Sequence, residues 1–169
     1  ISVEKISGNG YGGFKIVRQY MNSTITQNVV VYDKSRRIDF ENKIDWHEEH
    51  VLLKTVFPVS VHSNKANYEI QFGYVERPNH ENTSWDAAKF EVCAHKWADL
   101  SENGYGVALL NDCKYGFNTE GSTMKLTVLK CSQYPNAEAD QGAHKLTYSI
   151  MAYAYVFSTY DIRNKYRWI

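Results

Sequence analysis

Apolar and polar residues alternate with a period of two through most of this chain, and this alternation constrains its fold more than any other feature. Two runs rich in β-branched and aromatic residues, 14–21 and 24–32, flank Asn22-Ser23 and predict a β-hairpin. A second pair of strands is predicted at 36–46 and 51–57. The same reasoning predicts five further strands, at 67–72, 89–95, 105–110, 124–130 and 145–155.

Signals for helices are sparse in this sequence. Only 85–89 and 136–141 could hold a turn or two, and neither is a capped segment with a 3.6-residue period. The predicted fold class is therefore all-β. About nine strands joined by sequential hairpins favour an antiparallel β-sandwich of two packed sheets over a small closed barrel.

Length and composition predict one self-sufficient core. The chain has 169 residues, 43% of them apolar, which suffices for a single domain placed at 1–150. The remaining segment, 151–169, is basic and aromatic, lacks turn signals and is expected to be an atypical, poorly ordered tail. Because the chain does not begin with methionine, it is expected to be a piece of something longer.

The charges and the cysteines argue against several classes of partner. Nineteen basic and nineteen acidic residues cancel, so no broad basic face is expected for nucleic acid or an anionic membrane. No apolar run approaches the length of a membrane-spanning helix. Cys93, Cys113 and Cys131 match neither zinc-knuckle nor disulfide spacings, which predicts buried reduced thiols in a reducing compartment.

Two histidines and two glutamates lie together in the segment 47–50. A zinc-protease helix needs histidines four residues apart, whereas His47 and His50 are three apart between two predicted strands. An odd spacing on extended backbone sends side chains to opposite faces, so this segment predicts a polar hairpin turn. No metal site is predicted. No catalytic residue is predicted either, because the sequence contains no nucleophile signature and no spacing certifies a glycosidase pair of carboxylates.

The loop 77–86 is the first candidate binding segment. Pro78 is expected to end the strand that begins at Asn67, and the polar residues that follow favour local side-chain to backbone bonds. One interpretation is a self-satisfied surface loop with its tryptophan in the core. The other has polar groups that bond sugar hydroxyls beside an aromatic platform. The candidates in this loop are Arg77, His80, Asn82, Trp85 and Asp86.

A second candidate segment is 105–117, a buried strand that enters a turn. Gly116 allows positive φ in that turn. The turn is either structural or one wall of a site. Its candidate contact residues are Asp112, Lys114 and Tyr115.

At these segments the chain closely resembles the C-terminal β region of the α-mannosidases of glycoside hydrolase family 38. The likeness is greatest to the cytosolic and vacuolar branch, which also has bacterial members. It is dense and colinear over roughly 10–150 and stops at Met151. The segments that carry it are 44–50, 68–73, 77–86, 93–100, 110–116 and 136–142, followed by His144.

The resemblance implies a galactose mutarotase-like β-sandwich packed beside an N-terminal α/β barrel and a helical bundle. It also implies a retaining mechanism, with an aspartate nucleophile, a second carboxylate as acid and base, and a zinc ion that grips the mannose hydroxyls. The resemblance assigns all of those residues to the barrel. No catalytic residue and no cofactor are therefore expected in this chain, and zinc is expected in the full-length enzyme.

The resemblance thus implies an architectural part of an α-mannosidase, inactive alone, that buttresses the barrel and lines the cleft for a mannose-containing oligosaccharide. Its partners would be the missing N-terminal domains, and a homo-oligomer is a further arrangement that it allows. The implied location is the cytoplasm, or the vacuole if the source is a fungus. Two alternatives stay open: an autonomous carbohydrate-binding module, and a purely structural or oligomerising domain that exposes an apolar patch.

Overall fold

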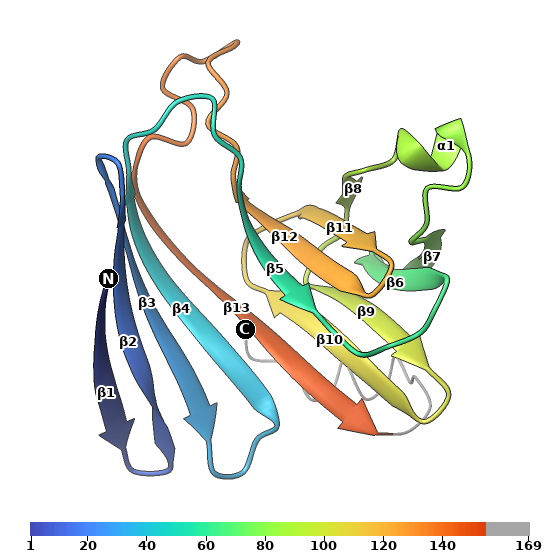
Figure 1. The fold of residues 1–169 in the computed structure, drawn as a ribbon, viewed down its shortest axis with the longest axis horizontal. Coiled ribbons are helices and arrows are strands. Elements are labelled where there is room, and N and C mark those ends of the chain that lie inside the picture. The colour runs from blue at the N-terminus through green and yellow to red at the C-terminus, as the bar shows by residue number, and fades with distance from the viewer. Residues whose placement is uncertain (155–169) are drawn as a thin grey trace.

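The computed structural model describes residues 1–154, which form two antiparallel sheets and one short helix (Figure 1). In spatial order, the nine-stranded sheet consists of β1 (Ser2–Gly8), β2 (Tyr11–Tyr20), β3 (Ser23–Tyr32), β4 (Arg37–Trp46), β13 (Gly142–Ala154), β10 (Tyr105–Asn111), β9 (Trp97–Glu102), β6 (Lys65–Ile70) and β7 (Gly73–Pro78). The four-stranded sheet consists of β5 (Leu53–Pro58), β12 (Thr123–Leu129), β11 (Gly116–Glu120) and β8 (Val92–Cys93). The helix, α1 (Ser84–Ala87), lies between β7 and β8 in the sequence.

The strand β13 joins the two halves of the larger sheet. It pairs with β4 from Gly142 opposite Trp46 to Met151 opposite Arg37, and its other edge pairs with β10. The strands β1 to β4 precede it as a meander of successive hairpins. One late strand therefore connects the N-terminal meander to β10, β9, β6 and β7.

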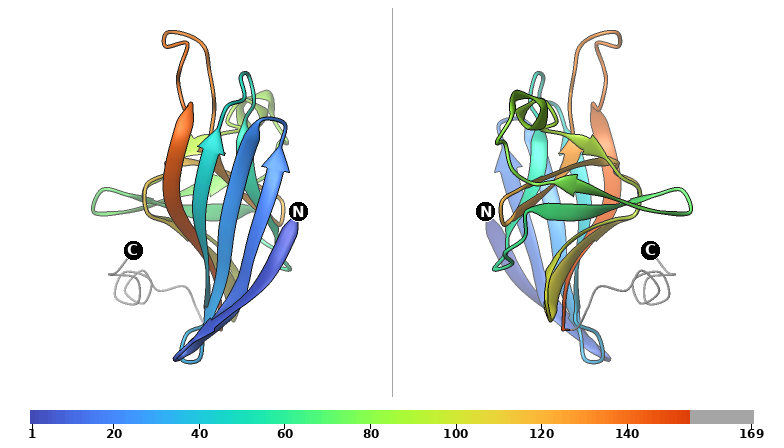
Figure 2. Two further views of the ribbon diagram at one scale, coloured as in Figure 1. Left: turned by 90° about the vertical axis from the view of Figure 1, so that its left-hand side faces the viewer. Right: turned by 90° about the vertical axis from the view of Figure 1, so that its right-hand side faces the viewer.

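The hydrophobic core lies between the two sheets, where the smaller sheet covers the middle of the larger one (Figures 1 and 2). The period-two alternation decides which side chains enter it, so that Met124, Leu126 and Val128 of β12 are buried in turn. Across the layers, the ring of Phe57 lies 5.4 Å from the ring of Phe40 and 6.0 Å from that of Tyr148. The predicted all-β class and two-sheet sandwich are confirmed.

Most predicted strands correspond to strands of the structure, including the β2–β3 hairpin, β4 and most of β13. Four strands escape the prediction, namely β1, β7, β9 and β11. The strand from Asn67 does not run to Pro78 as expected, because the chain turns after Ile70 and β7 returns antiparallel to β6. The predicted strand 89–95 is reduced to the two residues of β8.

The prediction of a hairpin turn at 47–50 is wrong. The segment crosses between the sheets, since β4 belongs to the larger sheet and β5 pairs with β12 in the smaller one. Long-range bonds determine this course. The buried carboxylate of Glu48 accepts hydrogen bonds from the Asn22 backbone and the Ser23 hydroxyl, and the His50 backbone N–H donates to the Cys131 carbonyl at 3.1 Å.

The prediction for the cysteines has a mixed outcome, and the domain division stays a prediction. All three cysteines are free thiols, but only Cys131 is buried, because Cys93 ends the two-residue strand β8 and Cys113 lies in the loop after β10, both exposed. The proposed boundary between residues 150 and 151 falls inside β13, which continues to Ala154, and the rest of the tail lies outside the described residues.

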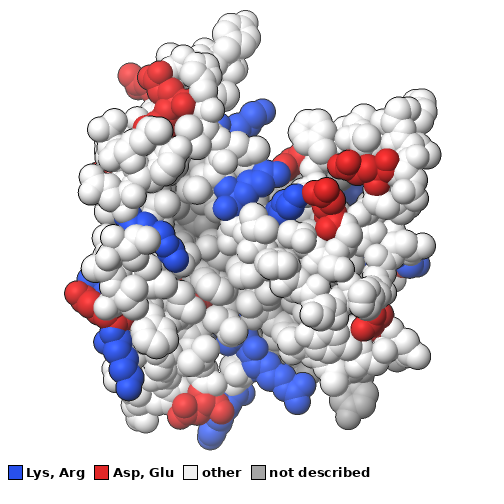
Figure 3. All heavy atoms as spheres, in the orientation of Figure 1, with Lys and Arg blue, Asp and Glu red and all other residues white. Residues whose placement is uncertain are grey.

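Within the described part of the chain, no helix is long and apolar enough to cross a membrane. Acidic and basic side chains are interspersed over the face shown in Figure 3.

Candidate functional site

A pocket of about 220 Å³ brings together two of the predicted site residues, Arg77 and Asp86. It lies where the β6–β7 hairpin, the loop that carries α1 and the strand β11 meet. Its walls include aromatic, charged and amide groups, which is a mixture found in small-ligand sites. The remaining lining residues are Tyr68, Glu76, Pro78, Lys89, Val92, Asn118 and Thr119.

Arg77 is held in place from two sides. Its guanidinium carbon lies 5.0 Å from the centre of the Tyr68 ring, and its Nη1 donates a hydrogen bond to the Cys93 carbonyl at 3.1 Å. Burial raises the pKa of the Tyr68 phenol, while a hydrogen bond with Thr119 and the Arg77 charge oppose that rise. The pocket therefore presents a fixed cation against a neutral phenol.

The loop that follows Arg77 satisfies most of its own polar groups. The buried Asn79 amide donates to the carbonyls of Ser63 and Gly121, at 2.9 and 2.8 Å, which anchors the loop to two other segments. Thr83 caps α1 by accepting a bond from the Asp86 N–H at 3.1 Å, and its hydroxyl donates to the Asp86 carboxylate at 2.8 Å. His80 Nδ1 lies 3.6 Å from the same carboxylate. Asp86 is therefore occupied chiefly as a loop-capping acid.

The interpretation of Trp85 as a plug in the core is wrong. Its side chain is 79% exposed, and none of the residues of α1 is buried. The helix stands away from the two sheets at one end of the sandwich (Figure 1). Asn82 is also exposed, and its backbone N–H donates to His80 Nδ1 at 3.4 Å. The loop thus offers an open aromatic surface beside a self-bonded turn.

The second predicted group lies on the loop after β10. Asp112 bonds to Thr147 of β13 through both its carboxylate and its backbone, at 2.9 and 3.1 Å. The Asn111 side chain accepts a hydrogen bond from the Lys114 N–H, which closes the turn. Tyr115 is exposed, with its ring edge-on to His95 at 6.1 Å.

Gly116 does not adopt the positive φ that glycine allows. Gly116 opens β11, and its glycine requirement comes from close packing instead. A Cβ atom at this position would lie 2.8 Å from Glu91 Oε1 and 3.1 Å from Thr127 Cβ. At Gly116 the constraint therefore comes from neighbouring side chains and not from the residue's own backbone conformation.

The two predicted groups lie on either side of one short segment of chain. Arg77 bonds to Cys93 in that segment, while the Tyr115 carbonyl accepts a bond from the Ala94 N–H at 3.0 Å. Among residues 1–154, no hydrogen bond or ion pair joins the two groups into one constellation. Each group instead braces the same segment from its own side.

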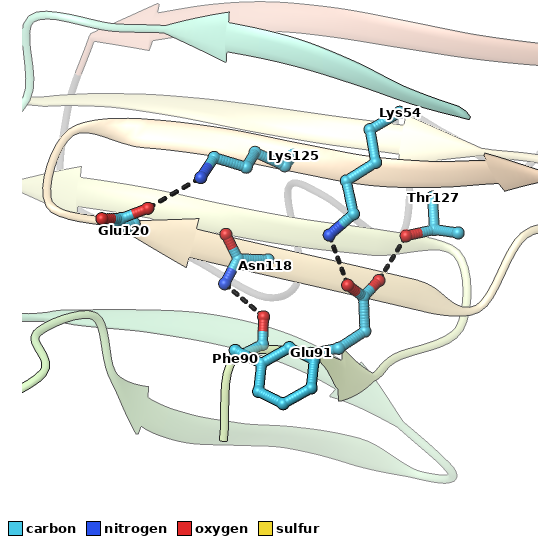
Figure 4. A network of polar contacts seen from close by, with 7 residues as sticks. All are labelled: Lys54, Phe90, Glu91, Asn118, Glu120, Lys125 and Thr127. Atoms are coloured by element: carbon cyan, nitrogen blue, oxygen red, sulfur yellow. Dashed lines mark hydrogen bonds and ion pairs between the residues drawn. The ribbon is translucent and has the colours of Figure 1, made fainter. Parts of the chain in front are cut away.

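A polar network on the outer side of the smaller sheet escapes the sequence prediction (Figure 4). Its centre is Glu91, whose carboxylate binds the Lys54 ammonium and the Thr127 hydroxyl. Near it, Asn118 donates to the Phe90 carbonyl, and Lys125 pairs with Glu120 at 2.7 Å. The partners of Glu91 are distant in sequence, so no local pattern could have indicated them. The network fastens β8 and the preceding loop to β5, β11 and β12.

The described residues contain one buried carboxyl group with a strongly shifted pKa. Burial raises the pKa of Asp99 to about 6, and hydrogen bonds with Tyr153, Ser101 and Asn67 oppose that rise. The residue is fully buried, so it has no surface through which to reach a substrate. Among residues 1–154, no group of three or more His, Cys, Asp or Glu side chains could hold a metal ion.

Comparison with known proteins gives one consistent result. The profile of the glycosyl hydrolases family 38 C-terminal domain matches residues 5–138. Alpha-mannosidase G of Dictyostelium discoideum is 51% identical over 129 residues, which are 76% of this chain and 12% of that protein. Alpha-mannosidase 2C1 of Homo sapiens is 51% identical over 130 residues, 77% of this chain and 12% of its own length.

More distant relatives extend the same result. An alpha-mannosidase of Saccharomyces cerevisiae is 45% identical over 128 residues, 75% of this chain and 12% of that protein. The crystal structure of an alpha-mannosidase from Enterococcus faecalis superposes with a TM-score of 0.81 at 14% identity, covering 98% of this chain and 23% of that one. At that identity the likeness shows a shared fold. The chain spans about an eighth of the length of the curated relatives that it matches.

Proposed function

The chain belongs to the glycosyl hydrolases family 38 C-terminal domain family, and from this premise we propose that it is a non-catalytic part of an α-mannosidase. In this role it supports the catalytic part of the longer protein and lines one side of its substrate cleft. The observation that carries the proposal is the share of each relative's length that this chain matches. Relatives at 51% identity are alpha-mannosidases, and 12% of their length corresponds to this chain. Most of such an enzyme therefore lies elsewhere.

An uncovered apolar surface supports the architectural part of this role. Phe14 of β2 lies opposite Val29, and Val29 lies opposite Phe40, whose ring packs against the smaller sheet. Side chains directly opposite one another share a face of a sheet, so Phe14 belongs to the core-facing side. It is nevertheless 51% exposed, and Val3 on the same side of β1 is 60% exposed. Such a surface is typical of a contact with another folded part of the protein.

The eight predicted contact residues remain candidates for the cleft. Trp85 and Tyr115 offer exposed aromatic faces, which suit the apolar side of a sugar ring. Arg77 is fixed in the pocket described above and offers a directional cation. The carboxylates of Asp86 and Asp112 already accept internal bonds, and His80 lies 3.6 Å from the Asp86 carboxylate, so these three side chains also hold their own loops in place. The substrate class proposed for the whole enzyme is a mannose-containing oligosaccharide.

The zinc ion implied by the family resemblance would be held outside this chain. The described residues offer no group of three ligands for a metal, so they do not fit that role. The proposed contribution of this chain is to shape the substrate cleft and to support the catalytic part of the enzyme. The location proposed for the enzyme is the cytoplasm, or the vacuole in a fungus.

A second candidate function is an autonomous carbohydrate-binding module. The exposure of Trp85 and Tyr115 favours it, because aromatic platforms carry sugar binding without a catalytic domain. The pocket of about 220 Å³ beside Arg77 is small and would hold about one sugar ring. A homo-oligomer whose copies meet through the apolar surface is a further proposal within the structural role.

Two experiments test the proposed function. The purified chain, assayed on an aryl α-mannoside with zinc added and titrated with mannose by calorimetry, should neither turn over nor bind. Turnover that is abolished by replacing the chain's own carboxylates would overturn the structural role. Saturable mannose binding by the chain alone would favour the carbohydrate-binding module.

The second experiment uses the longer enzyme that contains this chain. Replacing Trp85 and Tyr115 by alanine should raise KM for a mannose oligosaccharide about fivefold, with little change in kcat, because contacts to the ground state and transition state are lost equally. Tyr134→Ala is the control, since Tyr134 is exposed and lies in a different loop. Equal effects of the two variants would exclude a cleft-lining role for this surface.

A further inference from the structure

The side of the larger sheet that faces away from the smaller sheet carries a hollow of about 460 Å³. It crosses β2, β3, β4 and β13, whose strands lie in front in the left panel of Figure 2. It shares no residue with the pocket around Arg77. The side chains that face it include Lys15, Thr26, Asn28, Lys43, Lys145 and Thr147.

Two lysines in this hollow oppose each other directly. Lys43 of β4 and Lys145 of β13 are cross-strand partners in the antiparallel register. Side chains in such a pair leave the sheet on the same face with Cβ atoms about 5 Å apart, and like charges there are destabilising. Within residues 1–154, neither ammonium forms an ion pair, whereas Lys15 pairs with Glu4 at 3.8 Å. The fold therefore places two positive charges side by side, neither of them in an ion pair among the described residues.

The neighbours of the lysine pair include threonine hydroxyls and two carboxylates, Glu41 and Asp45. Thr26 lies opposite Lys43 on β3, which places a hydroxyl beside the two ammonium groups. Glu41 is the one carboxylate that lines this hollow, and it accepts a bond from the Asn28 amide at 3.2 Å. A second hollow of about 380 Å³ shares Thr26, Lys43 and Lys145 with the first, and its lining also includes Asp45, whose carboxylate lies 3.0 Å from His47 Nε2. The lysine pair and the Thr26 hydroxyl thus lie where the two hollows meet, in one continuous trough, and the two carboxylates lie on either side of Lys43 along β4.

We propose that this trough binds an oxyanion of the phosphate or sulfate class between Lys43 and Lys145. Such an anion brings several acceptor oxygens at neutral pH, so two flexible ammonium groups and a hydroxyl can converge on it. Its charge relieves the repulsion between the lysines. The anion is either free or carried by a sugar as a phosphate or sulfate ester.

The binding experiment uses the whole chain at constant ionic strength. Inorganic phosphate should raise the melting temperature saturably, beyond any effect of sodium chloride at the same ionic strength. Replacing both Lys43 and Lys145 by glutamine should weaken the apparent affinity for phosphate by about tenfold or more, because charge-assisted bonds are lost. A phosphorylated hexose, compared with the same hexose unmodified, distinguishes the sources: tighter binding than inorganic phosphate indicates an ester, and equal binding a free anion.

The matched control is the double variant Lys5→Gln and Lys34→Gln, which removes the same charge from exposed positions outside the trough. It should leave the phosphate affinity unchanged. Lys145→Glu gives a second readout, since it should stabilise the free chain at low salt by pairing with Lys43 and should abolish the response to phosphate. The proposal is overturned by a response no larger than that to sodium chloride, by equal losses in both double variants, or by a response retained in Lys145→Glu.

Discussion

The Glu48 carboxylate accepts a hydrogen bond from the Ser23 hydroxyl at 2.9 Å, although the two residues are 25 positions apart. Both side chains are buried, and the Ser23 hydroxyl in turn accepts a bond from the His47 N–H at 2.8 Å. This pair fastens the turn between β2 and β3 to the segment that leaves the larger sheet for the smaller one. The crossover is therefore specified by a buried acid and not by a local turn signal.

Glu48→Ala should lower the free energy of unfolding by about 2 to 3 kcal/mol. The substitution leaves the Ser23 hydroxyl and the Asn22 N–H without the charged acceptor that both use. Urea unfolding at neutral pH measures the change. Glu49→Ala is the matched control, because the neighbouring glutamate is exposed and should shift stability by less than about 0.5 kcal/mol. Similar losses in both variants would contradict the assigned role of Glu48.

Gly116→Ala should destabilise the chain by about 1 to 3 kcal/mol. The new methyl group would approach Glu91 Oε1, which is already bound to Thr127, so the Glu91 side chain must move and weaken that bond. Gly73→Ala is the matched control, because a Cβ there meets nothing within 4 Å. Thermal unfolding of both variants makes the comparison.

A double variant separates the clash from a general effect of alanine in a strand. In a Glu91→Ala background, Gly116→Ala should cost less than it does in the wild type, because the carboxylate that it would strike is absent. Strictly additive losses would show that Gly116 does not act through Glu91.

Asp99→Asn should change how stability depends on pH. The folded pKa of about 6 lies above the ordinary value of 3.8, so the folded state binds more protons between those values. The stability that protonated Asp99 contributes is therefore complete below about pH 4 and is lost as pH rises through 6. Asparagine does not titrate. Relative to the wild type, the free energy of unfolding of the variant should rise by on the order of 2 to 3 kcal/mol between pH 4 and pH 7.

Urea unfolding over that pH range measures the effect as a difference between the variant and the wild type. Asp33→Asn, at an exposed turn position, is the control and should give a flat difference. If the difference in unfolding free energy between Asp99→Asn and the wild type also stays constant with pH, folding does not change the protonation of the Asp99 carboxyl group in this range.

Whether sequence reasoning found or missed a strand depends on which of the strand's faces are buried and on which strand it pairs with. Strand β4 alternates apolar and polar residues because one of its faces meets the core, and that pattern is visible in the sequence. Strand β9 buries residues of both faces, including polar Asp99, so the alternation signal fails there. The choice of sheet for β5 depends on its pairing with β12, about seventy positions later, which no local pattern encodes.

The candidate site shows the same limit. The loop 77–86 was identifiable from its polar composition and its proline, and Thr83 and Asp86 have the three-residue spacing of a helix cap. The exposure of Trp85 was not predictable, because it depends on how far α1 stands from the sheets. The Glu91 network and the Lys43–Lys145 pair require knowledge of the strand register.

Phe14→Glu should have different effects in the isolated chain and in the longer enzyme. In the isolated chain the side chain is half-exposed, so the free energy of unfolding should change by less than about 0.5 kcal/mol. In the longer enzyme, where we propose that another part of the protein covers this surface, the same charge would be buried and should lower the melting temperature by about 2 to 4 °C. Phe72→Glu, at the exposed tip of the β6–β7 hairpin, is the control and should be neutral in both proteins. Equal melting temperatures for the wild-type and Phe14→Glu enzymes would mean that the surface stays open to solvent.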